Sequence, residues 1–182
     1  MYTVKIIISF LLIPTLYLHG QQIVISGVDG NRDLQWSDFT GVVDKTSSYS
    51  ANTHWNITYR YSGVRFENDK AALQGLIFKL ELDRDKSWIK HESESAFLLK
   101  HEQGHFDIAR LCLLEMKQSF DTAAFYKADY KTKPQTLFNA ILAKYNALSE
   151  TYDAETNHSK KQDIQKQWDL RLSRLLASAA GQ

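Results

Sequence analysis

The segment His101-Glu102-Gln103-Gly104-His105 constrains the fold of this 182-residue chain more than any other. Residues 93–127 around it contain no proline and one glycine, which favours a continuous α-helix. Helical residues four positions apart share a face, so the imidazoles of His101 and His105 can bind one metal ion. Glu102 flanks that face, where its carboxylate can take a proton from a water molecule at the metal.

The two histidines lie on a helical stripe whose other members are apolar. These members are Leu98, Ile108, Cys112 and Met116. An imidazole without a partner is costly to bury, so the histidines either bind a metal or are core residues satisfied by hydrogen bonds. The motif and its helical setting favour metal binding. Cys112 is the only cysteine, which excludes an intrachain disulfide, and it fits this stripe as a small core residue.

Two other residues of this helix lead to structural predictions. A glycine inside a helix costs about 1 kcal/mol relative to alanine. Gly104 therefore predicts the close approach of another backbone, such as a strand lying over the helix. Asp107 points away from the histidine face, and we expect it to be solvated and paired with Arg110 three residues later.

A catalytic zinc ion usually takes three protein ligands and a water molecule, so a third ligand is needed. Ile108 and Leu111 occupy the positions where the extended metzincin pattern has glycine and histidine, which excludes that class. The remaining candidates lie in residues 150–158, expected to form a loop between two helices. His158 is our first choice because imidazole suits zinc. The alternatives are two carboxylates of this segment, Asp153 and Glu155.

Three other residues are weaker candidates for the site. The Tyr152 hydroxyl could point at a developing oxyanion, but the apolar spacing favours a core aromatic at the end of its helix. His91 has Ser95 in place of a partner four residues later, and His54 lies on the polar face of a predicted strand. Both histidines are expected to be surface residues.

The first 20 residues are predicted to be a secretory signal peptide. They carry one charge, Lys5, and a short apolar run at 6–18, which makes Gln21 the expected mature start. The run is shorter than the roughly 20 apolar residues of a membrane span, so an uncleaved anchor is the less favoured alternative. We expect a secreted or periplasmic protein with no stable membrane insertion after removal of the leader.

The mature chain is predicted to be nearly neutral. The whole chain has 22 Lys and Arg residues, of which only Lys5 lies in the leader. The mature chain therefore carries 21 basic and 21 acidic residues. This balance argues against nucleic acid or an anionic membrane surface as the main partner. Residues 21–182 suffice for one domain of ordinary size, which we interpret as a single metalloprotease-like domain.

Hydrophobic periodicity changes from strand-like to helix-like along the chain. Strands are predicted at 22–26, 53–61 and 76–82, with a packed aromatic turn at 34–41; helices are predicted at 93–127, at 137–148 after Pro134, and from Lys160. Strands followed by helices indicate an α+β fold. The expected architecture is zincin-like, with an N-terminal antiparallel or mixed sheet packed on the long motif helix and helices after it.

The chain resembles a bacterial family of secreted zinc-dependent proteases, often described only as a domain of unknown function. The resemblance rests on four segments spread over most of the mature chain: residues 34–39, Ser87-Trp88, residues 98–107 and residues 152–158. It implies that His158 is the third ligand. The family pattern has glycine after that histidine, whereas this chain has Ser159. This departure concerns the local turn rather than the ligand, and the resemblance implies no particular substrate.

Together these observations predict a secreted zinc-dependent hydrolase, most simply a peptidase acting on a peptide or protein substrate. Zn²⁺ would be bound by His101, His105 and His158, with Glu102 as the general base. A strand of the N-terminal sheet is expected to form one cleft wall and to bind substrate by strand addition. The alternatives are a non-catalytic zinc-stabilised envelope module, closed by a fourth protein ligand, and a metal-free structural envelope protein.

Overall fold

The computed structural model describes residues 20–180, and the predicted leader lies outside them except for Gly20. Its main sheet has the order β2-β1-β7-β4 and is mixed, because β1 runs parallel to β7 while β4 runs antiparallel to it. The four strands are β1 (Gly20–Ile25), β2 (Val28–Asp29), β4 (Trp55–Arg60) and β7 (Ile77–Leu82). The strands predicted at 22–26, 53–61 and 76–82 correspond to β1, β4 and β7, which confirms them.

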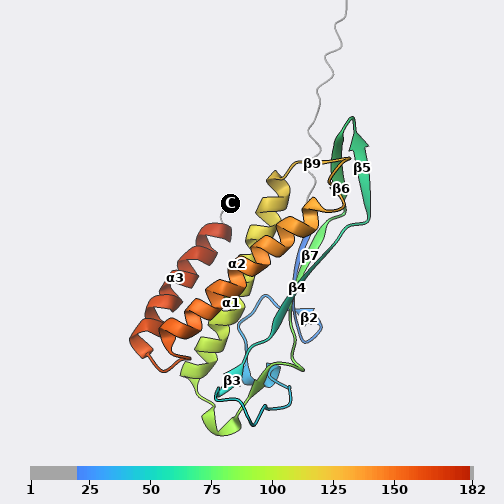
Figure 1. Cartoon of the computed structure of the whole chain (residues 1–182). Coiled ribbons are helices and arrows are strands. Elements are labelled where there is room, and N and C mark those ends of the chain that lie inside the picture. The colour runs from blue at the N-terminus through green and yellow to red at the C-terminus, as the bar shows by residue number, and fades with distance from the viewer. Residues whose placement is uncertain (1–19, 181–182) are drawn as a thin grey trace, which may run out of the picture.

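Two smaller sheets extend the structure at opposite ends of the main one (Figure 1). A two-stranded sheet pairs β3 (Ala51–Asn52) with β8 (Trp88–Ile89), and a projecting antiparallel sheet has the order β5-β6-β9. Its strands are β5 (Gly63–Glu67), β6 (Lys70–Gln74) and β9 (Phe125–Tyr126). Two short 3₁₀ helices, η1 (Trp36–Asp38) and η2 (His91–Ser93), complete this half of the chain.

The long helix α1 (Ala96–Thr122) lies between the sheets and the other two helices. It contacts β3, β4 and β7 on one side and α2 (Lys133–Thr156) and α3 (Gln162–Ala180) on the other (Figure 1). Ser95 caps its first turn, since the Ser95 hydroxyl accepts a hydrogen bond from the amide of Leu98 at 3.1 Å. The helix ends before the predicted 127 because the chain turns extended at Ala123 and pairs with β6.

The predicted loop at 150–158 is wrong, because α2 continues through Thr156. Pro134 lies in its first turn, where the missing N–H has no helical partner to lose. Asn157 ends the helix in the left-handed conformation at φ 49°. Asp153 and Glu155 are therefore helical residues, held in fixed directions by the packing of α2 on α1.

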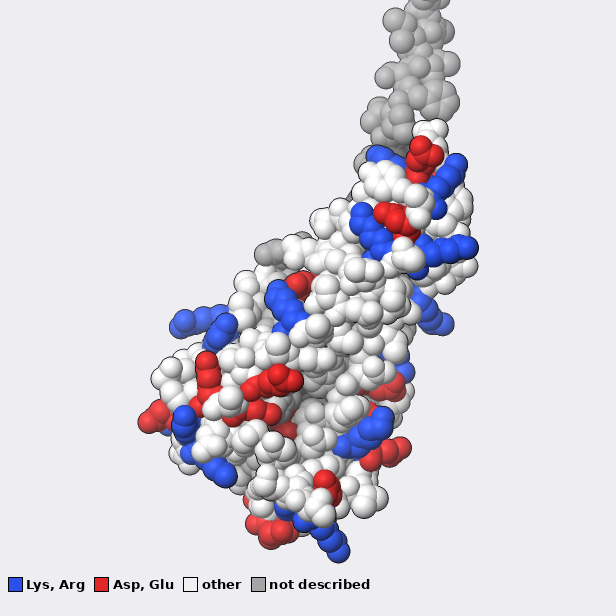
Figure 2. Space-filling model, viewed as in Figure 1, with Lys and Arg blue, Asp and Glu red and all other residues white. Residues whose placement is uncertain are grey.

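These elements form an α+β fold with one continuous hydrophobic core. The sheet contributes Phe78 and Leu80 to this core, and α1 contributes Phe106, Ile108 and Met116. Within residues 20–180 no helix combines the length and the apolar character that crossing a membrane requires. Lys and Arg side chains are interspersed with Asp and Glu over the face in Figure 2.

The predicted aromatic turn at 34–41 is packed, and it is held by a buried carboxylate. Asp38 is 2 % exposed. Its carboxylate accepts hydrogen bonds from the two terminal guanidinium nitrogens of Arg32, at 2.7 and 2.8 Å, and from the amide of Gln35 at 2.9 Å. Burial raises the pKa of Asp38, but the hydrogen bonds from Arg32 and Gln35 outweigh it and hold the pKa below its usual 3.8.

Asp38→Asn should destabilise the protein by about 2 kcal/mol at pH 7, since it leaves the guanidinium of Arg32 without its carboxylate. Because the folded-state pKa is depressed, this stabilisation is present above the ordinary Asp pKa and is lost as the pH falls below it. Urea unfolding from pH 7 to pH 3 measures both effects. Asp33→Asn, at an exposed position, is the control. Equal losses in the two variants would contradict the assigned role.

Candidate metal centre

The motif helix is buried on nearly every side at the level of the two histidines. His101, Glu102, Gln103 and His105 are at most 9 % exposed, as the sheet covers one side of α1 and the helices α2 and α3 cover the other. A helix in this position is enclosed rather than amphipathic, so its polar side chains need partners inside the protein.

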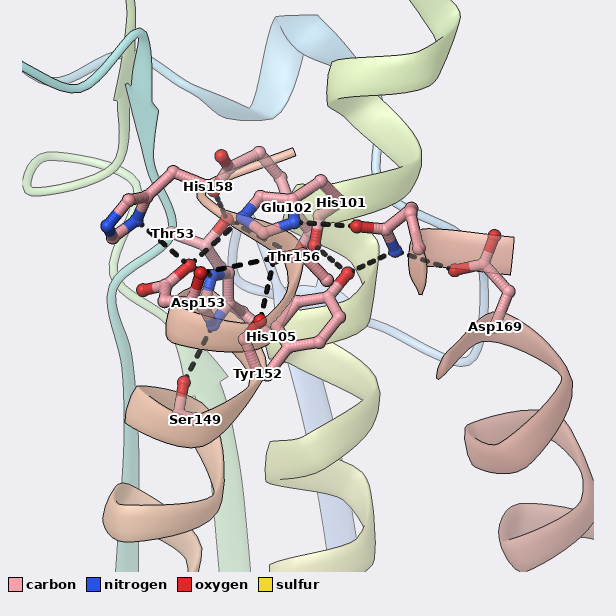
Figure 3. A network of polar contacts seen from close by, with 11 residues as sticks. Thr53, His101, Glu102, His105, Ser149, Tyr152, Asp153, Thr156, His158 and Asp169 are labelled. Atoms are coloured by element: carbon pink, nitrogen blue, oxygen red, sulfur yellow. Dashed lines mark hydrogen bonds and ion pairs between the residues drawn. The ribbon is translucent and has the colours of Figure 1, made fainter. Parts of the chain in front are cut away.

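The two motif histidines converge on Asp153 from α2. The Nε2 atoms of His101 and His105 each lie 3.1 Å from the same Asp153 Oδ1 atom (Figure 3). Within residues 20–180, these three side chains are the group of histidines and acids that could hold a metal ion, with donor atoms within 4.8 Å of one another.

The donor set fits a metal ion both in spacing and in chemistry. Zinc bonds of about 2.0–2.2 Å in a tetrahedron separate ligand atoms by roughly 3.3–3.6 Å, slightly more than the 3.1 Å between each Nε2 atom and Asp153 Oδ1. The Nδ1 of His101 lies 2.8 Å from the amide oxygen of Gln165, which can only accept a hydrogen bond, so Nδ1 carries the proton. In a neutral His101 ring the Nε2 lone pair then faces a carboxylate, and a proton or a cation must lie between them.

Without a metal, the surroundings of the pair favour a proton in that place. Burial lowers the pKa of His101, but the hydrogen bond to Asp153 and the negative charge of Glu102 outweigh it and raise the pKa. Burial raises the pKa of Asp153, but hydrogen bonds and charge from the two histidines hold it far below its usual value. The pair therefore favours a negative carboxylate next to a positive group, the arrangement that a divalent cation also satisfies.

Glu102 faces the same pocket without joining the three converging side chains. It is 3 % exposed, and its Oε2 accepts a hydrogen bond from the hydroxyl of Thr53 at 2.6 Å (Figure 3). Thr53 lies between β3 and β4, so the N-terminal half of the chain orients the carboxylate. The sequence prediction that Glu102 flanks the histidine face agrees with this placement.

His158 lies beside the converging groups but outside them. Its Nδ1 is 3.3 Å from Asp153 Oδ1, its side chain is 36 % exposed, and its ring packs on Tyr49 with centroids 4.5 Å apart. Glu155, the other carboxylate candidate, points elsewhere and accepts a hydrogen bond from the indole of Trp168 at 2.8 Å. His91 is exposed, as expected for a surface residue.

A pocket of about 180 Å³ opens over these side chains. Residues 49–53 form one wall, the motif turn of α1 forms the floor, and Ser149, Asp153 and His158 form the opposite wall. No lysine or arginine lines this pocket among the described residues. The pocket thus exposes the three converging side chains and the Glu102 carboxylate to one shared volume.

Tyr152 occupies the space that Gly104 leaves free on α1. It is fully buried and stacks on His101 with ring centroids 4.7 Å apart, and its hydroxyl donates to the His101 carbonyl oxygen at 3.1 Å. A Cβ atom at position 104 would lie 2.6 Å from Cζ of Tyr152. The predicted approach of another backbone at Gly104 is wrong, because the group that approaches is the side chain of Tyr152 from α2. Tyr152 is the core aromatic that the apolar spacing favours.

Asp107 corrects one further expectation. It pairs with Arg110 as predicted, but it is not solvated, since its side chain is 15 % exposed and accepts a hydrogen bond from Gln103 at 2.7 Å. Gln103 in turn accepts a hydrogen bond from the amide of Leu34. The motif helix therefore also holds the N-terminal aromatic turn.

A protein-family model describes most of this chain. Residues 26–159 match the model of bacterial proteins of unknown function called DUF922. The chain belongs to that family. The matched region contains both histidines, Glu102, Asp153 and His158, and it ends before α3. No curated protein and no solved structure matches the chain.

Sequence reasoning missed the groups that surround the metal-binding side chains. The Ser149 hydroxyl lies 2.7 Å from Nδ1 of His105. The Thr53 hydroxyl bonds to Glu102, and the Gln165 amide oxygen bonds to His101. For Gln165 a signal was present, because it precedes Trp168 and Leu172 on the buried stripe of α3. A polar residue at helical spacing on an apolar stripe indicates a buried polar partner.

Gly104→Ala should destabilise the protein by about 1–3 kcal/mol through overpacking, although alanine is the better helix former. The added methyl group has to push Tyr152 away from His101. Urea unfolding of the metal-free protein measures the loss. Gly63→Ala is the matched control, since a Cβ there meets its nearest neighbour at 3.8 Å. A Gly104→Ala protein as stable as the parent would contradict the tight contact.

Proposed function

We propose that this protein is a metal-dependent hydrolase of zincin type, most simply a secreted or periplasmic zinc peptidase. The proposal rests on one observation above all: two histidine nitrogens and one carboxylate oxygen converge at 3.1 Å beside a buried glutamate. His101, His105 and Asp153 would hold the metal. A zinc ion bound there would polarise a substrate carbonyl and lower the pKa of a coordinated water molecule.

Each nearby residue has a distinct part in such a reaction. Glu102 takes the proton of the attacking water and passes it to the leaving amine, and the Thr53 hydroxyl holds its carboxylate toward the pocket. The ring stacking of Tyr152 and the contacts of Gln165 and Ser149 hold the two imidazoles in place. His101 and Glu102 are buried at the floor of the pocket, where charges interact more strongly than in water.

The free edge of β3 supports a peptide as the substrate. The Ser50 carbonyl accepts a hydrogen bond from the Lys90 amide at 2.9 Å, on the side of β3 that pairs with β8. Because successive residues of a strand turn their N–H and C=O groups to opposite sides, those of Ala51 point away from β8. Ala51 lines the pocket, so an extended peptide can pair with it and lie across the pocket.

A second candidate function, a zinc-stabilised module without catalysis, is favoured by the position of His158. Its Nδ1 lies 3.3 Å from Asp153 Oδ1, near enough for a rotation of the ring to bring a fourth protein ligand to the metal. Four protein ligands would close the site to water. The two functions differ in the coordination number of the bound metal and in the presence of hydrolysis.

The purified protein should bind about one Zn²⁺ per chain. His101→Ala, His105→Ala and Asp153→Ala should each weaken zinc binding by more than about 100-fold, the upper range for groups that only surround ligands. Competition with a chromophoric chelator measures the affinity.

Glu155→Ala serves as the control, because the Glu155 carboxylate bonds to Trp168 instead. His158→Ala should weaken binding far less than Asp153→Ala. A protein that takes up no zinc would refute the proposed function. Loss of zinc in His158→Ala but not in Asp153→Ala would return His158 to the position of third ligand.

Glu102→Gln should keep the zinc ion and lose about 10²–10⁴-fold in hydrolysis, because the amide cannot accept the proton of the attacking water. Cleavage of a peptide library by the zinc-loaded protein, followed by mass spectrometry, measures turnover. The exposed Glu92→Gln is the matched control. Unchanged turnover in Glu102→Gln would remove this residue from the mechanism, and loss of zinc would make it a ligand.

A further inference from the structure

We propose that α3, which lies beyond the family-matched region, is a working part of the metal centre, and that its Gln165 is the residue that sets the tautomer of His101. This inference rests on the proposed metal site. The matched region ends at residue 159, whereas Gln165 is fully buried and reaches back to a ligand on α1. The centre is thus completed by a helix outside the matched region.

Every polar atom of the Gln165 amide has a partner inside the protein. Its oxygen lies 2.8 Å from Nδ1 of His101, and its nitrogen donates to the Tyr152 hydroxyl and to Asp169 Oδ1, the latter at 2.8 Å. Burying a glutamine costs free energy unless all these bonds form. A residue chosen only to fill this space next to Trp168 and Leu172 would be apolar.

The partners of the amide nitrogen fix the orientation of the whole group. Asp169 is a carboxylate and can only accept, so it requires the NH₂ side of the amide. The Tyr152 hydroxyl donates its hydrogen bond to the carbonyl oxygen of His101 and therefore accepts one from the Gln165 amide. A flipped amide would set its oxygen against the Asp169 carboxylate. The amide oxygen must consequently face His101.

This orientation decides where the His101 ring carries its proton. An amide oxygen requires Nδ1–H, which leaves the lone pair of Nε2 directed at Asp153 and free for a metal. The equivalent partner of His105 is the hydroxyl of Ser149, which can donate as well as accept and so imposes no tautomer. Asp153 can accept only from Nε2–H, so without a metal it opposes this tautomer; once a metal occupies Nε2, Gln165 is the partner that holds the proton on Nδ1.

The first test replaces the amide without changing the size of the side chain greatly. Gln165→Met should lower zinc affinity by about 10–100-fold, the range for groups that orient ligands. Gln167→Met, the same change at an exposed position of the same helix, should leave it unchanged. Asp169→Asn should weaken zinc binding several-fold although Asp169 does not touch His101, because it allows the amide to flip. Equal affinities for Gln165→Met and Gln167→Met would overturn the proposal.

A second test separates orientation from packing. In the double variant Gln165→Glu with Asp169→Asn, the new carboxylate at position 165 accepts from His101, and the new amide at position 169 donates to that carboxylate. The double variant should therefore restore zinc affinity lost in either single variant. Failure of this rescue in a folded protein would reduce Gln165 to a packing residue. In the zinc-loaded protein, ¹⁵N NMR of the imidazoles should find a His101 Nδ1–H that exchanges slowly with water, and this exchange should become faster in Gln165→Met. An unchanged exchange rate in Gln165→Met would refute the inference even if zinc binds, and absence of zinc binding would refute the proposed function alone.

Discussion

The contact between Tyr152 and Gly104 determines where α2 sits on α1, and the three converging side chains of the candidate site depend on that position. The tyrosine ring enters the space left by the missing side chain, stacks on His101 and bonds to its carbonyl oxygen. Asp153 is the next residue of α2, so the depth at which Tyr152 packs sets the place of the neighbouring carboxylate. Because helical residues have fixed directions, a shift of α2 by an ångström would carry Asp153 away from both imidazoles.

The negative charges of Asp153 and Glu102 have to be balanced within the same site. Asp153, Glu102 and the two imidazoles lie around one pocket, and none of the described residues that line it is a lysine or an arginine that could balance the two carboxylates. A proton on His101 meets this need in the metal-free protein, and the raised pKa of His101 and the depressed pKa of Asp153 are its signs. A divalent cation meets it more completely, since it can interact with both histidines and the carboxylate at once. Metal binding and protonation of His101 should therefore compete.

The parts of the structure that follow local rules could be predicted from the sequence. Alternation identified β4 and β7, and the absence of helix breakers identified α1 with its histidine pair. The third member of the converging group could not be chosen by chemistry alone, because imidazole and carboxylate both suit zinc. The choice depends on how far α2 extends. No proline or glycine interrupts the chain between Pro134 and Asn157, so the helical reading of Asp153 was open to sequence analysis. The reach of Gln165 depends on the return of α3 and is visible only in the fold.

The turn between α2 and α3 determines both where α2 ends and how Gln165 of α3 reaches His101. Asn157, His158 and Ser159 all have left-handed backbones, with φ of 49°, 50° and 68°. Such residues cost about 1–2 kcal/mol each relative to right-handed ones unless the surroundings hold them. Here the amides of His158 and Lys161 bond to carbonyls of the last turn of α2. The glycine that the family resemblance predicts at position 159 would adopt this φ freely, so Ser159 adds strain to this turn. Strain of this kind persists where the fold needs the geometry: the turn sets His158 beside Asp153 and directs α3 so that Gln165 reaches His101. One short turn therefore links the rim of the pocket to the helix that supports its floor.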